Sequence, residues 1–206
     1  MLNSLHREVE KFRAWASNYP LEHRSGEWEC DYEEWPALNS SFAAYLNSHS
    51  PRETDDLVVS DLIYAVARDN EMEDLVSELA EKPEWFAYLL TFISDCDEPD
   101  ARWQFAVALG RHILPFADAE RALMKLVADE HEYVSRMALQ SLGRIGSAHA
   151  ESLCERAWTT NHEYQRIMAL WVLKEIGSPK LSSYLTLAKT DHRKYVVSNA
   201  LEIERA

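Results

Sequence analysis

Hydrophobic residues recur every three or four positions along most of the chain. In residues 2–18 this spacing places six apolar side chains on one helix face: Leu2, Leu5, Val9, Phe12, Trp15 and Ala16. Similar spacing predicts helices at 33–48, 54–68, 71–81, 84–94 and 99–113. Residues 19–31, with Pro20 and Gly26, interrupt the pattern and predict a loop. Because strand signals are nearly absent, the sequence predicts an all-α protein.

The second half contains an internal repeat. Segments 129–146, 160–177 and 191–206 align without gaps at a period of 31 residues, and a looser copy lies at 101–111. Three kinds of residue coincide in the three close copies: tyrosine (Tyr133, Tyr164, Tyr195), alanine (Ala138, Ala169, Ala200) and leucine (Leu139, Leu170, Leu201). Shorter apolar helices at 116–128, 147–158 and 178–188 alternate with these segments. Each unit is therefore a helix pair, and stacked neighbours complete a core that one pair cannot bury alone.

The repeat resembles HEAT-like repeats, particularly the short bacterial variety first noted in phycobilin lyase subunits. The inner helix of that family reads approximately Asp, four residues, Val-Arg, two residues, Ala, three residues, Leu-Gly. The copy at 129–146 matches with Ser135 in place of the arginine; its matching residues are Asp129, Val134, Ala138, Leu142 and Gly143. The next copy keeps Arg166 and the last keeps Asp191. The resemblance implies an α-solenoid of about five to six antiparallel helix pairs, and it is silent about activity.

Several repeat positions have a structural explanation. We expect Ala138, Ala169 and Ala200 where the paired helix approaches closely, because a larger side chain there would separate the layers. Gly146 and Gly177, each followed by serine, suit helix ends that require positive φ. Asp129 and Asp191 are candidates to cap the helices that follow them.

The formal net charge of −14 is distributed unevenly. Residues 1–100 hold 23 acidic and 7 basic side chains, whereas residues 101–206 hold 12 and 14. We expect one continuous domain with an acidic helical part at 1–95 and the repeats at 96–206. An acidic surface attracts basic partners and repels phosphate backbones, so a protein partner is favoured over nucleic acid.

Motifs for catalysis or for cofactor binding are missing from the sequence. It has no Gly-rich phosphate loop, Cys-x-x-Cys, His-Glu-x-x-His or Gly-x-Ser-x-Gly. His131 and His162 align within the repeat, but ligands one helix layer apart, roughly 8–10 Å, cannot share a metal ion. We therefore predict a protein that is not an enzyme, without cofactor or metal.

The three cysteines and the hydropathy of the chain indicate the cellular compartment in which we expect the protein. Cys30, Cys96 and Cys154 are odd in number and far apart, which favours a reducing compartment, and Cys154 falls on an apolar helix as a core residue would. No apolar run approaches the length of a membrane span, and the first residues are charged. The expected location is the cytoplasm, with no membrane partner.

One candidate binding site is the segment 26–35. It interleaves acidic and aromatic side chains, the composition of a protein-binding hot spot, in Glu27, Trp28, Glu29, Asp31, Tyr32, Glu33, Glu34 and Trp35. We expect the glutamates to be solvated. An equally weighted interpretation is that the tryptophans fix a loop to the helical body. Further acids could extend the surface: Glu53, Asp55, Asp56, Asp61, Asp69, Glu71, Glu73 and Asp74.

The alternative site is a basic ridge on the later helices of the repeats. It comprises Arg102, Trp103, Arg136, Arg144, Arg166 and Trp171, joined by Lys174, Arg193 and Lys194. Basic and aromatic side chains together can hold phosphate and stack bases. In this respect the chain resembles HEAT-like DNA glycosylases of the alkylation-repair type. Those enzymes are strongly basic, however, whereas this chain has a net charge of −14.

The favoured hypothesis is a protein-binding scaffold without catalytic activity. Among bacterial HEAT-like proteins of this size, an acidic binder resembles immunity proteins that neutralise basic toxins, commonly nucleases. The alternatives are a DNA glycosylase of the alkylation-repair type and a lyase or chaperone subunit of the phycobilin type.

Overall fold

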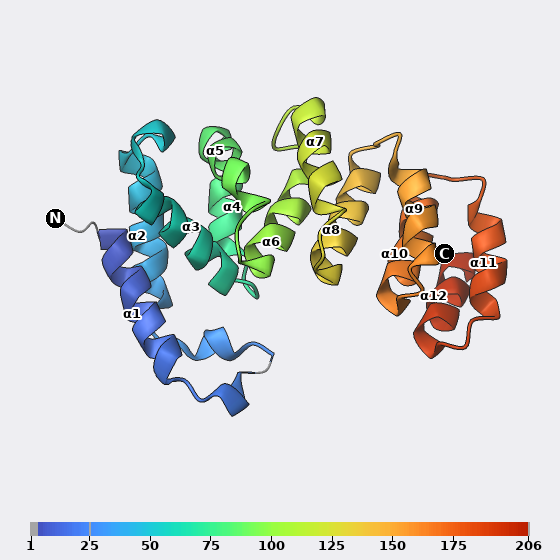
Figure 1. Ribbon diagram of the computed structural model, residues 1–206, viewed down its shortest axis with the longest axis horizontal. Helices are drawn as coiled ribbons and strands as arrows, with labels where there is room; N and C mark the ends of the chain where they lie inside the picture. The colour runs from blue at the N-terminus through green and yellow to red at the C-terminus, as the bar shows by residue number, and fades with distance from the viewer. Residues whose placement is uncertain (1–3, 25, 206) are drawn as a thin grey trace. The chain divides into compact units, whose positions relative to one another are not determined.

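The computed structural model describes residues 4–24 and 26–205. These residues form twelve α-helices and three short 3-10 helices without a β-strand, which confirms the all-α prediction (Figure 1). The α-helices are α1 (Ser4–Asn18), α2 (Trp35–Ser48), α3 (Asp56–Arg68), α4 (Asp74–Ala80), α5 (Pro83–Ile93), α6 (Pro99–Leu109), α7 (Phe116–Leu126), α8 (Glu132–Arg144), α9 (Ala150–Thr159), α10 (Glu163–Glu175), α11 (Leu181–Lys189) and α12 (Lys194–Arg205). The 3-10 helices are η1 (Leu21–His23), η2 (Trp28–Asp31) and η3 (Pro51–Glu53). The chain divides into two compact units, Met1–Phe105 and Ala106–Ala206.

The first unit is built on contacts of α1 with α2 and α3, and of α4 with α2, α3 and α5. Its core contains four phenylalanines that are almost fully buried: Phe12, Phe42, Phe86 and Phe105. Polar side chains also hold its helices together. Trp85 Nε1 donates to the Leu46 carbonyl at 3.0 Å, and Gln104 Nε2 donates to the Val66 carbonyl at 2.7 Å.

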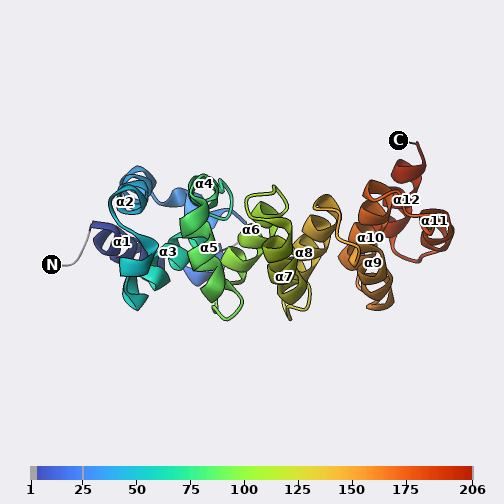
Figure 2. The same cartoon turned by 90° about the horizontal axis from the view of Figure 1, so that it is seen from above.

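The second unit consists of layered helix pairs. Helices α8, α10 and α12 contact one another in series, while α7, α9 and α11 pack against them (Figure 2). Ala138, Ala169 and Ala200 lie on α8, α10 and α12 and have no exposed surface, as the repeat predicts. The burial of Cys154 on α9 is likewise as expected.

Close contact between successive layers explains the Leu-Gly pairs of the repeat. A Cβ atom at Gly110 would lie 2.7 Å from Ser141 Oγ, and one at Gly143 would lie 2.8 Å from Val172 Cγ1. Both distances are shorter than real Cβ contacts, so the next helix could not approach as closely if a side chain replaced either hydrogen. Gly146 and Gly177 have φ of 73° and 64°, which confirms their predicted helix-terminating conformation.

The serine after each of these two glycines links successive outer helices. Ser147 Oγ donates to Glu120 Oε1 at 2.6 Å, and Ser178 Oγ donates to Glu151 Oε2 at 2.5 Å. Each hydroxyl oxygen also accepts from the backbone amide two residues later. We call these contacts the serine joints; they tie α9 to α7 and α11 to α9.

The predicted capping by aspartate needs correction. Asp129 Oδ1 accepts from the His131 amide at 2.8 Å, but His131 is itself the N-cap of α8, and its side chain makes no capping hydrogen bond. Asp191 Oδ1 accepts from the Arg193 amide at 2.9 Å in the same way. Two residues separate each aspartate from the first residue of its helix. Each carboxylate therefore stabilises the turn before the helix and does not cap the helix itself.

Two stretches of the chain differ from their predicted secondary structure. The predicted loop at 19–31 contains η1 and η2, and the helix predicted at 99–113 ends at Leu109. None of the helices in the described part of the chain has the length and apolar character of a membrane span.

Candidate functional site

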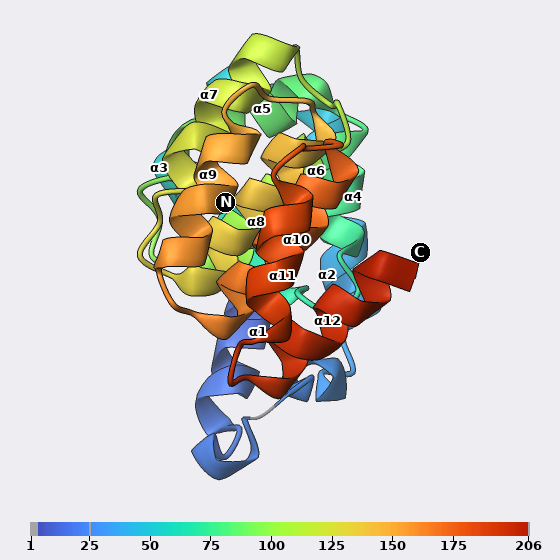
Figure 3. The ribbon, with the colours of Figure 1, turned by 90° about the vertical axis from the view of Figure 1, so that its right-hand side faces the viewer.

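The aromatic side chains of segment 26–35 pack against α1. Figure 3 shows the chain between α1 and α2 at the C-terminal end of α1. The Trp28 ring stacks on Trp15 with centroids 5.4 Å apart and planes 6° apart. Tyr32 and Trp35 lie 4.8 Å and 5.2 Å from the Phe12 ring centroid.

Trp35 also fixes the backbone of the segment. Its Nε1 donates to the Glu29 carbonyl at 2.8 Å, which holds η2 against the start of α2. The sequence left open whether the aromatic residues anchor a partner or fix the loop. These contacts show that they pack against the helical body, while Trp28 and Trp35 remain half-buried.

The carboxylates fall into two groups. Glu27, Asp31, Glu33 and Glu34 are exposed, and Glu34 pairs with Lys11 Nζ at 3.0 Å. Glu29 is only 4% exposed, so the expectation of a solvated side chain is wrong at this position. The reason is the turn of η2, which directs Glu29 toward Arg68 Nη1 at 3.9 Å instead of toward solvent.

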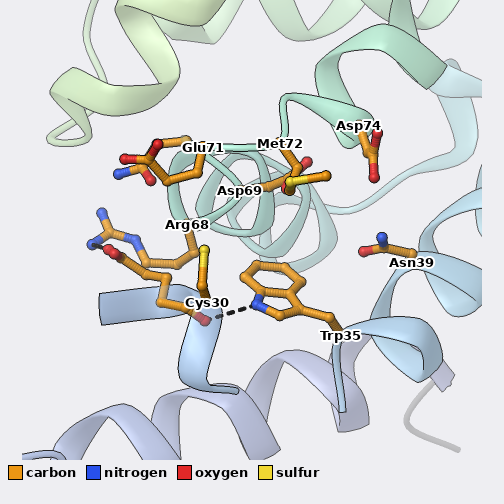
Figure 4. Close-up of a pocket in the computed structure, with 10 residues that line it drawn as sticks. Cys30, Trp35, Asn39, Arg68, Asp69, Glu71, Met72 and Asp74 are labelled. Carbon is orange, nitrogen blue, oxygen red and sulfur yellow. Dashed lines mark hydrogen bonds and ion pairs between the residues drawn. The ribbon is translucent and has the colours of Figure 1, made fainter. Parts of the chain in front are cut away.

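Glu29 lines a pocket of about 240 Å³ together with residues from α2 and from the connection between α3 and α4 (Figure 4). We call it the acidic pocket; its walls are Glu29, Cys30, Trp35, Asn39, Arg68, Asp69, Asn70, Glu71, Met72 and Asp74. The acidic run in the sequence anticipated Asp69, Glu71 and Asp74. It gave no indication of Asn39, Arg68, Asn70 or Met72, which only the path of the chain brings to Glu29.

Burial changes the acidity of two carboxyls in this pocket. Asp69 is 5% exposed, and burial raises its pKa to about 6 although Asp69 Oδ2 accepts from the Leu75 amide at 2.7 Å. Burial also raises the pKa of Glu29, an effect that the nearby Arg68 guanidinium partly offsets. Both carboxylates would gain from a hydrogen-bond donor that carries positive charge.

A second and larger hollow of about 630 Å³ is lined by α3, the end of α5 and the connection from α5 to α6. Its walls include the apolar side chains Val59, Ile63 and Phe92. Four carboxylates also line this hollow, which we call the acidic groove: Asp56, Asp95, Asp97 and Glu98. Arg68 ion-pairs with Glu98 and lies over the Tyr64 ring at 5.3 Å, so its charge is shared between the groove and the acidic pocket.

The alternative basic ridge is not a continuous exposed surface. Arg102 and Trp103 belong to the first unit and are 8% and 7% exposed. Arg102 Nη1 donates to the Cys96 carbonyl at 2.6 Å, and Trp103 Nε1 donates to Asp100 Oδ1 at 3.2 Å. These two side chains support the fold of the first unit.

The remaining ridge residues lie in the second unit. Arg136 pairs with Glu132 at 3.0 Å and lies between the rings of Tyr133 and Tyr164, at 4.6 Å and 5.2 Å. Trp171 Nε1 donates to Asn199 Oδ1 at 2.8 Å, and Arg144 is exposed. Most of the predicted ridge is thus already engaged with other protein groups.

Arg166 belongs to an ionic network in which the Asp191 side chain is buried and the two arginines are partly exposed. Its Nη1 lies 2.6 Å from Asp191 Oδ2, and Arg193 Nη2 lies 2.7 Å from the same oxygen. Hydrogen bonds from Arg193, and then from Arg166, hold the pKa of Asp191 well below its usual range. The Arg and Asp positions of the repeat motif therefore connect one helix pair to the next.

One set of side chains could supply metal ligands. His6, Glu10 and Asp61 place one ligand atom each within 4.8 Å of one another, on α1 and α3. The Arg13 guanidinium supplies positive charge to the two carboxylates of this set. Its Nη1 lies 2.7 Å from Glu10 Oε1 and 3.3 Å from Asp61 Oδ1. In this arrangement a guanidinium already balances both carboxylates.

Comparison with known proteins identifies the family. A designed armadillo repeat protein in complex with the peptide (KR)4 has a similar fold, with a TM-score of 0.57, 15% identity, and coverage of 98% of this chain and 99% of that chain. This likeness agrees with the predicted α-solenoid class. Comparison with curated proteins gives no match. The sequence matches HEAT repeats over residues 86–174 and 120–203, more than half of its length. The chain belongs to the HEAT repeat family, whose scaffolds are suited to binding proteins.

Proposed function

We propose that this HEAT repeat protein binds a basic protein through the carboxylates of its first unit and has no catalytic activity of its own. More specifically, we propose an immunity or inhibitor protein that neutralises a basic toxin of the nuclease type in the cytoplasm. The observation that carries the proposal is the excess of carboxylates over cations around the acidic pocket and the acidic groove.

The local charge balance favours a cationic partner. Four carboxyls line the acidic pocket, where Arg68 is the single cation among the described wall residues, and four line the acidic groove beside Arg13. Segment 26–35 adds four exposed acids to the same unit. Such a distribution accelerates encounter with a basic protein and repels an acidic one.

The designed armadillo repeat protein gives independent support at the level of fold. It was solved with (KR)4, a peptide of alternating lysine and arginine. A helical repeat scaffold of this type can therefore bind a highly basic chain.

The arginines of the second unit are less available for binding a nucleic acid. Arg136 and Arg166 pair with Glu132 and Asp191, so a phosphate would have to displace a carboxylate at each position. We therefore place the binding surface in the first unit.

Association kinetics test the proposal. A partner identified by pull-down from the source cells, or encoded by a toxin gene beside this one, is measured at two salt concentrations. Replacement of Glu27, Glu33 and Glu34 by Gln should slow association about tenfold at low salt and flatten its salt dependence, because steering depends on unscreened charge. If the partner is a nuclease, excess wild-type protein should abolish its activity.

A matched variant controls for charge alone. Glu130, Glu175 and Glu202 are exposed glutamates of the second unit, and their replacement by Gln removes the same net charge. This variant should associate nearly as fast as the wild type. An acidic partner, or equal slowing by both triple variants, would contradict the proposed surface.

A further inference from the structure

The acidic pocket contains hydrogen-bond acceptors that lack partners. Glu29 is 4% exposed, and its Oε2 atom is buried without a hydrogen bond. The side-chain oxygens of Asn39 and Asn70, in the same pocket, are also buried and unpartnered. A buried acceptor without a donor costs about 1–3 kcal/mol, so the pocket would be stabilised by a ligand that supplies several donors.

The arrangement of carboxylates disfavours a single metal ion as that ligand. Among the described residues, only His6, Glu10 and Asp61 gather three potential ligand atoms within 4.8 Å of one another, and none of the three lines the pocket. The pocket acids are more dispersed. Dispersed acceptors suit a larger cation with donors on several sides.

The size and the walls of the pocket suit a side chain. Its volume of about 240 Å³ is below the roughly 300–1,000 Å³ typical of pockets for drug-sized ligands. The Trp35 indole forms one wall, and Met72, which is 68% exposed, provides an adaptable apolar rim (Figure 4). An indole face attracts a planar cation, and an unbranched thioether adapts to the stem that carries it.

We propose that the acidic pocket receives one arginine side chain of the basic partner. The inference rests on the proposed function for the existence of that partner. The guanidinium has five donors in a planar fork, which suits Glu29 and the other carboxylates of the pocket, and the Trp35 indole offers a face for its plane. Arg68 does not fill this role: its guanidinium pairs with Glu98 and lies over Tyr64, and its Nη1 stays 3.9 Å from Glu29 Oε1, beyond hydrogen-bond distance.

The test uses small probes and the full chain, so it needs no partner. N-acetyl-arginine amide is titrated into labelled protein, and the Trp35 indole and Asn39 amide resonances are followed by NMR. The citrulline analogue has nearly the same shape without the charge, and calcium chloride is a separate probe. Arginine should bind at least tenfold more tightly than citrulline and should shift the pocket resonances.

Two variants locate the site. Glu29→Gln retains the shape of the buried side chain, and Glu71→Gln alters an exposed wall residue that should not affect folding. Arginine binding should weaken at least fivefold in Glu29→Gln and about twofold in Glu71→Gln. Glu27→Gln, an exposed residue outside the pocket, should bind as the wild type does.

Three results would overturn the inference: equal binding of arginine and citrulline, unchanged affinity in both pocket variants, or pocket shifts produced by calcium alone. These results leave the proposed function to its own test. A basic partner could still bind with salt-dependent association while the pocket stays empty. Conversely, arginine could bind the pocket while no basic partner exists.

Discussion

The acidic pocket of the first unit and the Asp191 network of the second unit use carboxylates in opposite ways. Residues 1–105 carry 23 acidic and 8 basic side chains, whereas residues 106–206 carry 12 and 13. In the acidic pocket of the first unit, burial raises the pKa of Asp69 and Glu29, and Arg68, the single cation among the described wall residues, lies 3.9 Å from Glu29. In the second unit, Asp191 is buried between two arginines and its pKa is lowered.

This difference separates a surface that can serve binding from a surface that serves folding. Charges that satisfy one another within the repeat add to stability and leave little for a partner. Buried carboxyls with a raised pKa lower stability at neutral pH, and natural proteins tolerate such features chiefly at functional sites. Four predictions address this contrast.

The largest effect should come from breaking the core of the second unit. Ala169 is fully buried on α10, so Ala169→Glu places a charge between helix layers and should remove more than about 4 kcal/mol of stability. Circular dichroism during heating should show loss of cooperative unfolding for the second unit. Ala117→Glu is the control, because Ala117 is exposed on α7. A melting temperature equal to that of the wild type would show that the Ala169 position is accessible.

The ionic network should rank next. Asp191→Ala leaves Arg166 and Arg193 without their shared carboxylate and should lower the free energy of unfolding by about 3–5 kcal/mol at pH 7. Because the folded pKa of Asp191 lies below its ordinary value of 3.8, this contribution is present at neutral pH and fades only as the pH falls below about 4. Urea unfolding at pH 7 and at pH 3 measures both effects.

An exposed ion pair provides the control for this prediction. Asp118 and Arg121 are 52% and 70% exposed and lie 2.9 Å apart. Asp118→Ala should change the free energy of unfolding by less than about 1 kcal/mol. Equal losses in the two variants would show that the Asp191 network is no stronger than a surface pair.

Asp69 should show the opposite dependence on pH. Its folded pKa of about 6 exceeds the ordinary value of 3.8, so its contribution to stability is complete below about pH 4 and is lost as the pH rises through 6. Asp69→Asn cannot ionise, yet it retains an acceptor for the Leu75 amide. Urea unfolding should therefore show the variant gaining about 2–3 kcal/mol relative to wild type between pH 4 and pH 7. A constant difference would mean that Asp69 titrates normally.

The smallest effect concerns the segment that carries Glu29. Trp35→Phe removes the hydrogen bond to the Glu29 carbonyl and should lower stability by about 1 kcal/mol. Hydrogen exchange of the η2 amides should accelerate at the same time. Trp28→Phe, which retains an aromatic ring against Trp15, is the comparison variant and should have less effect on η2 exchange. Equal exchange in the two variants would show that the hydrogen bond does not hold the segment.

The fold of the second unit could be predicted from the sequence because the contacts that stabilise it repeat along the chain. Ala138, Ala169 and Ala200 mark buried positions, and Gly146 and Gly177 mark helix ends, all at a spacing of 31 residues. A periodic pattern reports contacts between adjacent helices, which lie within a few tens of residues of one another. Aspartate capping was misplaced because one or two residues decide where a helix begins.

The candidate site was less accessible for a related reason. The acidic pocket combines Glu29, Asn39 and Asp69, which no repeat or motif connects. Alternating acids and aromatic residues revealed the segment that forms one wall. They did not indicate that η2 would turn Glu29 inward, because that orientation depends on Trp35 and Arg68 as well.

The serine joints of the second unit have a consequence for how such a protein can change its length. Ser147 bonds Glu120 and Ser178 bonds Glu151, so each joint spans 27 residues and needs nothing outside the adjoining helix pairs. A duplicated pair inserted between α9 and α11 would bring its own serine and its own glutamate. The second unit can thus accommodate the gain or loss of one repeat, whereas the acidic pocket, whose contacts do not repeat, would be lost if a helix pair were inserted among its walls.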